Sequence, residues 1–193
     1  MIQIIPPPTH DAPQVVKILI GDVRRDLPLM PVALPGHRVA VFNVLGDWEL
    51  TEAAGRALAK LVPRETEVLL MPDGKAQALL HVVARETRLP SVVARKSVKS
   101  YMAEPLVSVP LRSITTQETQ FLYLDGRTAD QLRGKRVLIV DDVVSTGGTI
   151  RVARYLLEEV VKATVVGVLA VFTEGDERPD VLSLGHLPLF RDP

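Results

Sequence analysis

The sequence of 193 residues contains no cysteine, so disulfides, zinc thiolate sites and cysteine nucleophiles are excluded. It also lacks an excess of either charge, since 23 basic and 23 acidic residues cancel. Such a chain has no global field that would draw it to nucleic acid or to an anionic membrane. Long apolar runs are missing too, and the longest, residues 163–172, is about half of a membrane span. We expect a cytoplasmic protein with no nucleic-acid and no membrane partner.

Proline is unevenly spread and divides the chain. Seven of the 15 prolines fall within the first 35 residues, which excludes a helix there and favours short strands and extended segments. In this part the residues VVKILIGDVRRDLPL predict a hairpin that turns at Gly21 and Asp22. The length suits about one domain. We therefore separate an N-terminal extended segment or hairpin, residues 1–37, from a main domain, residues 38–193.

From residue 38 onward, apolar runs of strand type alternate with segments of helical periodicity. Strands are predicted at 38–44, 67–71, 91–94, 137–140 and 164–172, and helices at 48–62, 75–88 and 149–163. Between them, residues 106–113 and 119–125 predict an antiparallel pair that follows a polar segment. The alternation argues for an α/β fold with a central, mostly parallel sheet flanked by helices on both faces.

The stretch VLIVDDVVSTGGT, residues 137–149, carries most of the chemistry. Its two aspartates, Asp141 and Asp142, follow a buried strand, and ligands of parallel sheets bind beyond the carboxyl ends of such strands. The next loop offers hydroxyls, backbone N–H groups and glycines that allow close approach, followed by the positive end of a helix. Its residues are Ser145, Thr146, Gly147, Gly148 and Thr149. A phosphate seat beside two carboxylates that accept bonds from vicinal hydroxyls fits a ribose 5-phosphate group.

Other motifs fit the same stretch less well. A Walker loop needs a lysine before its final hydroxyl residue, and this loop has none. A dinucleotide fingerprint needs three spaced glycines, whereas only Gly147 and Gly148 occur. The remaining alternative is a plain junction of strand, turn and helix with a solvated acidic pair. The agreement of all 13 positions favours the phosphate seat over that alternative.

The same stretch resembles the phosphoribosyl pyrophosphate (PRPP) signature of type I phosphoribosyltransferases. The resemblance implies that Asp141 and Asp142 belong to the catalytic centre and hold the ribose 2- and 3-hydroxyls, and that residues 145–149 bind the 5-phosphate. Two further segments are similar to parts of adenine and xanthine phosphoribosyltransferases. VVARKSVKSYM, residues 92–102, looks like their flexible catalytic loop with its β hairpin, and residues 41–59 like their small hood and first helix. The implied fold is the type I phosphoribosyltransferase fold.

As the resemblance implies, such enzymes exchange the pyrophosphate on C1 of ribose for a purine nitrogen. Mg²⁺ is carried by the pyrophosphate, and no residue is assigned as a direct metal ligand. Catalysis is then mostly positioning, neutralisation of leaving-group charge and exclusion of water by a closing loop. Arg95, Lys96 and Lys99 are expected to supply the cations and Tyr101 to cover the site, the alternative being a solvated basic loop. Because loop cations of related enzymes reach the neighbouring subunit's site, we expect a homodimer.

The pyrophosphate loop is expected after the second predicted strand, where the sequence is MPDGKAQ. Gly74 matches the family's glycine and precedes a helix, which suits an anion. Family members commonly carry a basic residue just before this glycine, whereas here Asp73 precedes it and Lys75 follows it. We assign these three residues to pyrophosphate binding and expect the exchange to affect it. A cis Met71–Pro72 bond is expected in the ligand-competent state, because cis before proline costs only about 0.5 to 1 kcal/mol.

Candidates for base recognition lie near the hood and beyond the last predicted strand. Phe42 offers stacking and Asn43 both a donor and an acceptor, and Val143 follows the aspartates. The alternatives are core packing for Phe42, a turn for Asn43 and helix packing for the nearby Trp48. At the position of Glu174, xanthine enzymes that resemble this chain tend to have a lysine. Since the Glu174 carboxylate can accept a bond from an exocyclic amino group, adenine is favoured and guanine comes second.

The main hypothesis is therefore a purine salvage enzyme that resembles adenine phosphoribosyltransferase and uses PRPP and a purine base. One alternative is a PRPP-binding regulatory protein of the same fold with weak or no catalysis. A DNA-binding version is disfavoured because the chain has no basic excess and no helix-turn-helix segment. The others are a xanthine, guanine, hypoxanthine or pyrimidine phosphoribosyltransferase, of which the hood likeness disfavours the pyrimidine enzyme.

Overall fold

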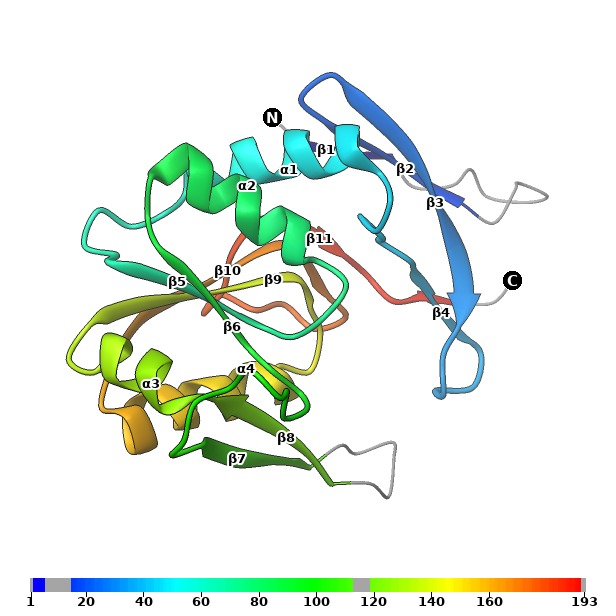
Figure 1. Ribbon diagram of the computed structural model, residues 1–193. Helices are drawn as coiled ribbons and strands as arrows, with labels where there is room; N and C mark the ends of the chain where they lie inside the picture. Colours follow the sequence, from blue (N-terminus) through cyan, green and yellow to red (C-terminus); the bar gives the residue numbers. More distant parts are fainter. Residues whose placement is uncertain (1, 6–14, 113–118, 192–193) are drawn as a thin grey trace.

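The centre of the protein is a parallel five-stranded sheet (Figure 1). The computed structural model describes residues 2–5, 15–112 and 119–191. In the order β11-β10-β9-β5-β6, the strands are Leu182–Leu187, Thr164–Glu174, Arg136–Val144, Val68–Pro72 and Ser91–Ala94. All four pairings are parallel, so the predicted central sheet is confirmed. The middle strand, β9, is the one that carries the two aspartates.

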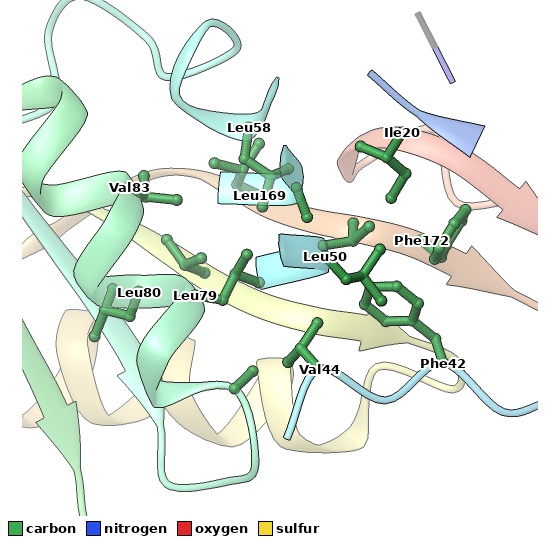
Figure 2. Close-up of a cluster of buried hydrophobic side chains, with 14 of the residues drawn as sticks. Ile20, Phe42, Val44, Leu50, Leu58, Leu79, Leu80, Val83, Leu169 and Phe172 are labelled. Carbon is green, nitrogen blue, oxygen red and sulfur yellow. The ribbon is translucent and has the colours of Figure 1, made fainter. Parts of the chain in front are cut away.

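Helices cover both faces of this sheet, as the alternation predicts. On one face lie α1 (Trp48–Ala59) and α2 (Gln77–Thr87), and on the other α3 (Gly126–Leu132), α4 (Gly148–Tyr155) and the π-helix η1 (Leu156–Val161). Successive strand residues point to opposite faces, so Leu69 and Leu138 join the core of α1 and α2, while Leu70 and Ile139 join the core of α3 and α4. Figure 2 shows the first core, where Leu50 and Leu58 of α1 meet Leu169 of β10.

A second, antiparallel sheet joins strands from both ends of the described chain. In the order β1-β2-β3-β4-β12, they are Ile2–Ile5, Val15–Ile20, Val23–Pro31, His37–Ala40 and Phe190–Arg191. The predicted hairpin is confirmed, since β2 and β3 pair around a turn in which Gly21 has a φ of +59°. The N-terminal strands thus share a sheet with β4 and β12. The division of the chain at residue 37 stays a prediction.

The strand predicted at 38–44 is corrected by the structure. Only His37–Ala40 form β4, which pairs antiparallel with β3 and β12 and is not part of the parallel sheet. The chain leaves the sheet because Phe42 and Val44 insert into the core of α1 and α2 (Figure 2). The apolar pattern of this segment therefore reports burial in the core and not a longer strand.

The remaining elements partly follow the sequence. β7 (Val107–Arg112) and β8 (Thr119–Leu124) form the predicted antiparallel pair. α3, β11 and β12 are not among the predicted elements, although α3 begins with a capping signal: Asp125 accepts a bond from the Thr128 N–H at 2.9 Å. The helix predicted at 149–163 consists of α4 and η1 and ends at Lys162, whose φ is +65°. Within the described residues, no helix is long and apolar enough to cross a membrane.

Close contact between α1 and α2 depends on Gly55. A Cβ at this position would lie 2.6 Å from Val82 Cβ and closer still to Val82 Cγ1. In an unobstructed helix, Gly→Ala stabilises by about 1 kcal/mol. Here we expect Gly55→Ala to lower the free energy of unfolding by about 1 to 3 kcal/mol, because the helices must separate. Urea denaturation measures the change.

The control for this prediction removes the obstacle. Gly55→Ala combined with Val82→Gly should be at least as stable as Val82→Gly alone, since the glycine has no Cβ to meet the new methyl group. A Gly55→Ala protein as stable as the wild type would contradict the close packing of the two helices.

Candidate active site

Asp141 and Asp142 lie within β9, which continues past its predicted end at Val140 as far as Val144. Neighbours on a strand point to opposite sides, and the two carboxylates meet different cations accordingly. Asp142 is buried, and its Oδ2 lies 3.2 Å from Lys75 Nζ. Asp141 is affected by the charge of Lys96. The pair is thus flanked by one lysine that precedes α2 and one from the predicted catalytic loop.

The acidic pair is electrostatically unfavourable as it stands. Burial raises the pKa of Asp141 to about 7, and the charge of Asp142 adds to the shift, while Lys96 acts in the opposite direction. The Asp142 N–H donates to Asp141 Oδ1 at 2.9 Å, which favours the ionised form. A ligand that brings two hydroxyl donors would stabilise the doubly ionised pair. A vicinal diol has this property.

The loop after β9 is held by two arginines. Arg178 Nη1 donates to Ser145 O at 3.1 Å, and Arg151 Nη1 donates to Thr146 O at 2.9 Å. In a planar trans peptide the C=O points opposite to the next N–H. Because both carbonyls face arginines, the N–H groups of Thr146 and Gly147 point away from them. These two donors are therefore turned to the other side of the loop, where an anion can accept from them.

The start of α4 completes this candidate phosphate seat. Gly147 is buried and precedes the helix with a φ of +71°, a conformation that side chains rarely adopt. Gly148 and Thr149 begin the helix, whose first turn contains no acidic residue. Ser145 and Thr146 are exposed, so their hydroxyls can reach a ligand. The predicted phosphate-binding residues are therefore together at one helix N-terminus.

Asp73, the residue that departs from the family pattern, is engaged with other side chains. Its Oδ1 accepts from Gln77 Nε2 at 2.6 Å, and its Oδ2 lies 3.5 Å from Arg95 Nε. The Arg95 backbone in turn pairs with Tyr123, at 2.9 and 2.7 Å. Asp73 thus joins the predicted pyrophosphate loop to Arg95 of the predicted catalytic loop. Its negative charge is partly neutralised by the arginine.

Lys75 is also predicted to bind pyrophosphate, but here its ammonium group contacts the neighbouring parts of the site. Its Nζ donates to Phe42 O at 2.7 Å and pairs with Asp142. Its charge also lowers the pKa of Glu174, which burial and Asp142 raise. Lys75 therefore links the hood segment, the acidic pair and the end of β10. Gly74 lies beside it. A Cβ at Gly74 would meet Pro72 O at 3.7 Å, an ordinary van der Waals distance, so the space beside this glycine is open to a ligand.

The base-side residues fall into two groups. The Phe42 ring, 1% exposed, packs edge-to-face on Phe172 with centroids 5.0 Å apart, so the stacking role predicted for this ring is corrected to core packing (Figure 2). Asn43 is exposed and its Oδ1 accepts from the Leu45 N–H at 3.1 Å, which is the turn interpretation. Trp48 is 73% exposed and is not packed as a core residue of α1.

Glu174 and Val143 lie at the carboxyl ends of adjacent strands. Val143 of β9 pairs with Phe172 of β10, and Glu174 is the last residue of β10. Both are partly buried. They lie beside the acidic pair, and their role in base binding stays a prediction.

The other loop residues lie at the surface. Lys96 and Lys99 are exposed and half-buried respectively, and Tyr101 is 72% exposed. Met71–Pro72 is not cis in this structure, whose cis bond in the described residues is Glu104–Pro105. The expectation for Met71–Pro72 in the ligand-bound state stays a prediction. Sequence reasoning finds neither Arg151, whose side chain turns back from α4 to Thr146 O five positions earlier, nor Arg178, which lies 33 positions from Ser145.

The fold and the site define an α/β protein with a candidate anion seat at the carboxyl end of its central strand. Residues 45–183 match the family model of the phosphoribosyl transferase domain. The chain belongs to this family, and its type I fold is confirmed.

Relatives in the family have different names. The purine biosynthesis transcriptional repressor PurR of Bacillus subtilis is 32% identical over 148 residues, 75% of this chain but only 50% of the repressor. A hypoxanthine/guanine phosphoribosyltransferase of Methanococcus voltae is 36% identical over 132 residues, 68% of this chain and 65% of that enzyme. The chain thus spans half to about two thirds of these proteins.

Solved structures agree on the fold. Adenine phosphoribosyltransferase of Thermoanaerobacter pseudethanolicus has a TM-score of 0.66 at 24% identity, covering 83% of this chain and 95% of that one. The enzyme of Rhodothermus marinus has a TM-score of 0.61 at 23% identity, covering 83% and 93%. At these identities the likeness concerns the fold alone.

The raised pKa of Asp141 predicts a pH-dependent stability. Between about pH 4 and 7 the folded protein retains a proton that the unfolded chain has released, so the free energy of unfolding contributed by this group falls as the pH rises. Asp141→Asn should flatten this slope and raise the free energy of unfolding at pH 8 by about 1 kcal/mol or more. Denaturation at several pH values measures it. Asp130→Asn, in a surface pair with Arg133, is the control, and a slope unchanged by Asp141→Asn would contradict the assignment.

Proposed function

We propose that the protein transfers the 5-phosphoribosyl group from PRPP to a purine base, giving a nucleoside monophosphate and pyrophosphate. The observation that carries the proposal is the sequence of groups along β9 and its loop. Asp142, which is buried, and its half-buried neighbour Asp141 are followed within a few residues by two backbone N–H groups turned away from arginine-bound carbonyls. This arrangement provides acceptors for a diol and donors for a phosphate within a few residues. Family membership supports the same substrate.

The residues divide the work of the transfer between them. Asp141 and Asp142 hold the ribose hydroxyls, and the loop at 145–149 holds the 5-phosphate, so C1 of the ribose is fixed. Lys96 and Lys99 of the catalytic loop neutralise the leaving pyrophosphate, with Gly74 allowing close approach of the backbone. Charge on the leaving group is the main obstacle, and fixed cations stabilise it as it develops.

Magnesium is proposed to enter as part of the PRPP substrate, where it neutralises pyrophosphate charge. The nearby carboxylates are already engaged with cations, Asp142 with Lys75 and Asp73 with Arg95. Within the described residues, no group of three or more histidine, aspartate or glutamate side chains could hold a metal. We also propose that Tyr101 covers the substrate when the loop closes, and that the protein is a cytoplasmic homodimer in which loop cations reach the partner's site.

Adenine is the base that we favour. Glu174 ends β10 beside the acidic pair, and its carboxylate can accept from an exocyclic amino group. The solved structures of similar fold include adenine enzymes. A 6-oxopurine is the second candidate, because the Lys75 ammonium beside Glu174 can donate to a carbonyl oxygen. Several sequence relatives are named hypoxanthine/guanine phosphoribosyltransferases.

A PRPP-binding regulatory protein is the second candidate function. Its supporting observation is Asp73, which occupies the position of the family's basic residue and forms an ion pair with Arg95. A loss of pyrophosphate affinity through this exchange would leave binding of the sugar phosphate intact. The match to a purine repressor supports the same candidate.

Turnover of a panel of bases tests the main proposal. We expect pyrophosphate release from PRPP and Mg²⁺ with adenine, and slower release with guanine or hypoxanthine. Pyrophosphate release with 6-oxopurines alone would assign base selection to Lys75 instead of Glu174. No release with any base, together with tight PRPP binding, would instead support the regulatory protein.

The acidic pair gives a second prediction that holds for either function. Asp141→Asn combined with Asp142→Asn should weaken ribose 5-phosphate binding roughly 100-fold, since two charge-assisted hydrogen bonds are lost. Calorimetric titration measures the affinity, and the thermal unfolding temperature should not fall. An unchanged affinity would show that the pair is only a polar strand end.

A further inference from the structure

The loops that follow β9 and β10 leave the sheet side by side. Val144 of β9 pairs with Thr173 of β10, so the phosphate loop and the segment after Glu174 start from adjacent strand ends. Arg178 belongs to this second segment. It reaches across to the first, 33 positions away in the sequence, through the bond from its Nη1 to Ser145 O.

Arg178 is fixed in place and is not a loose surface cation. Its Nε and Nη2 donate to the two oxygens of Asp180 at 2.8 and 2.7 Å, a bidentate pair. Its side chain is only 18% exposed, although that of Asp180 is 57% exposed. Three of the five guanidinium N–H groups are used in these contacts, which leaves one on Nη1 and one on Nη2.

The guanidinium also covers Gly147. A Cβ on this residue would clash with Arg178 Nη1 and lie 2.8 Å from Nη2. The positive φ of Gly147 disfavours a side chain independently. The backbone conformation therefore demands glycine here, and a side chain would in addition displace the Arg178 guanidinium. The guanidinium thus packs directly on the residue that precedes α4.

These contacts give Arg178 a role in the phosphate seat. We propose that Arg178 is a positioning residue that holds Ser145–Gly147 in the conformation that directs their N–H groups to a phosphomonoester. By fixing Ser145 O, it sets the direction of the Thr146 N–H, since both belong to one rigid peptide plane. Its charge favours an anion at the same place. The inference rests on the proposed function, because it concerns the 5-phosphate of the same substrate.

A comparison with Arg151 shows what is particular to Arg178. Arg151 holds Thr146 O from within α4, so it follows any movement of that helix. Arg178 instead comes from the segment that begins at Glu174. Phosphate seat and base side are connected through one side chain.

Titration of the purified protein with ribose 5-phosphate, and separately with pyrophosphate and Mg²⁺, tests the proposal. Arg178→Gln should weaken ribose 5-phosphate binding about tenfold or more and leave pyrophosphate binding unchanged. Arg178→Lys should restore part of the loss, because charge is retained without the bidentate pair. Asp180→Asn should give a smaller loss. The control is Arg133→Gln at the end of α3, which removes a surface pair with Asp130 and should change neither affinity.

The outcomes separate this inference from the proposed function. If the wild type does not bind ribose 5-phosphate, both the positioning role of Arg178 and the proposed function are contradicted. If the wild type binds it and Arg178→Gln binds equally well, only the positioning role is overturned. An equal loss of both ligands with a lower unfolding temperature would also overturn it, since the effect would be general. If Arg178→Gln does not fold, Asp180→Asn decides by its selective loss or its lack of one. In an active enzyme, Arg178→Gln should raise KM for PRPP more than it lowers kcat.

Discussion

The site depends on the repulsion between two neighbouring carboxylates at the end of a buried strand. β9 lies in the middle of the sheet, so burial raises the pKa of Asp141 and the charge of Asp142 raises it further. Positive charge from the surrounding segments offsets this repulsion, with Lys75 beside Asp142 and Lys96 acting on Asp141. Groups whose interactions are incomplete in the folded protein are the ones that a ligand can complete. A diol would supply the missing donors.

The departure of the pyrophosphate loop from the family pattern has a structural explanation. Asp73 forms an ion pair with Arg95 and so contacts the predicted catalytic loop. The positive charge beside Gly74 is carried by Lys75, which turns to Phe42 O and the acidic pair. Cations are therefore present around the proposed leaving group, but they come from different positions than in the family. Whether they support catalysis or only binding separates the two proposed functions.

The sequence predicts the local parts of this account well. The order of strand, acidic pair, hydroxyl-rich loop and helix is visible in residues 137–149 because each feature depends on near neighbours. Alternating patterns likewise predict the parallel sheet. The features that the sequence does not predict depend on contacts between residues far apart in the chain. Lys75 meets Phe42 O, and Arg178 meets Ser145 O, each across 33 residues.

The Phe42 ring illustrates the same limit. Its sequence position beside the hood suggests stacking on a base, yet it packs on Phe172, which only the fold brings near. α3 has only seven residues, too few to show a helical period, and the apolar pattern of β11 is interrupted by Gly185 and His186. Local chemistry is thus predictable here, whereas the choice between core and site for an apolar residue is not.

The most direct test of the central claim is a crystal structure with ribose 5-phosphate bound. The account predicts that the phosphate accepts bonds from backbone N–H groups of residues 146–149 and that the sugar hydroxyls donate to Asp141 and Asp142. Sugar phosphate bound elsewhere on the protein, with the carboxylates still facing only Lys75 and Lys96, would contradict it.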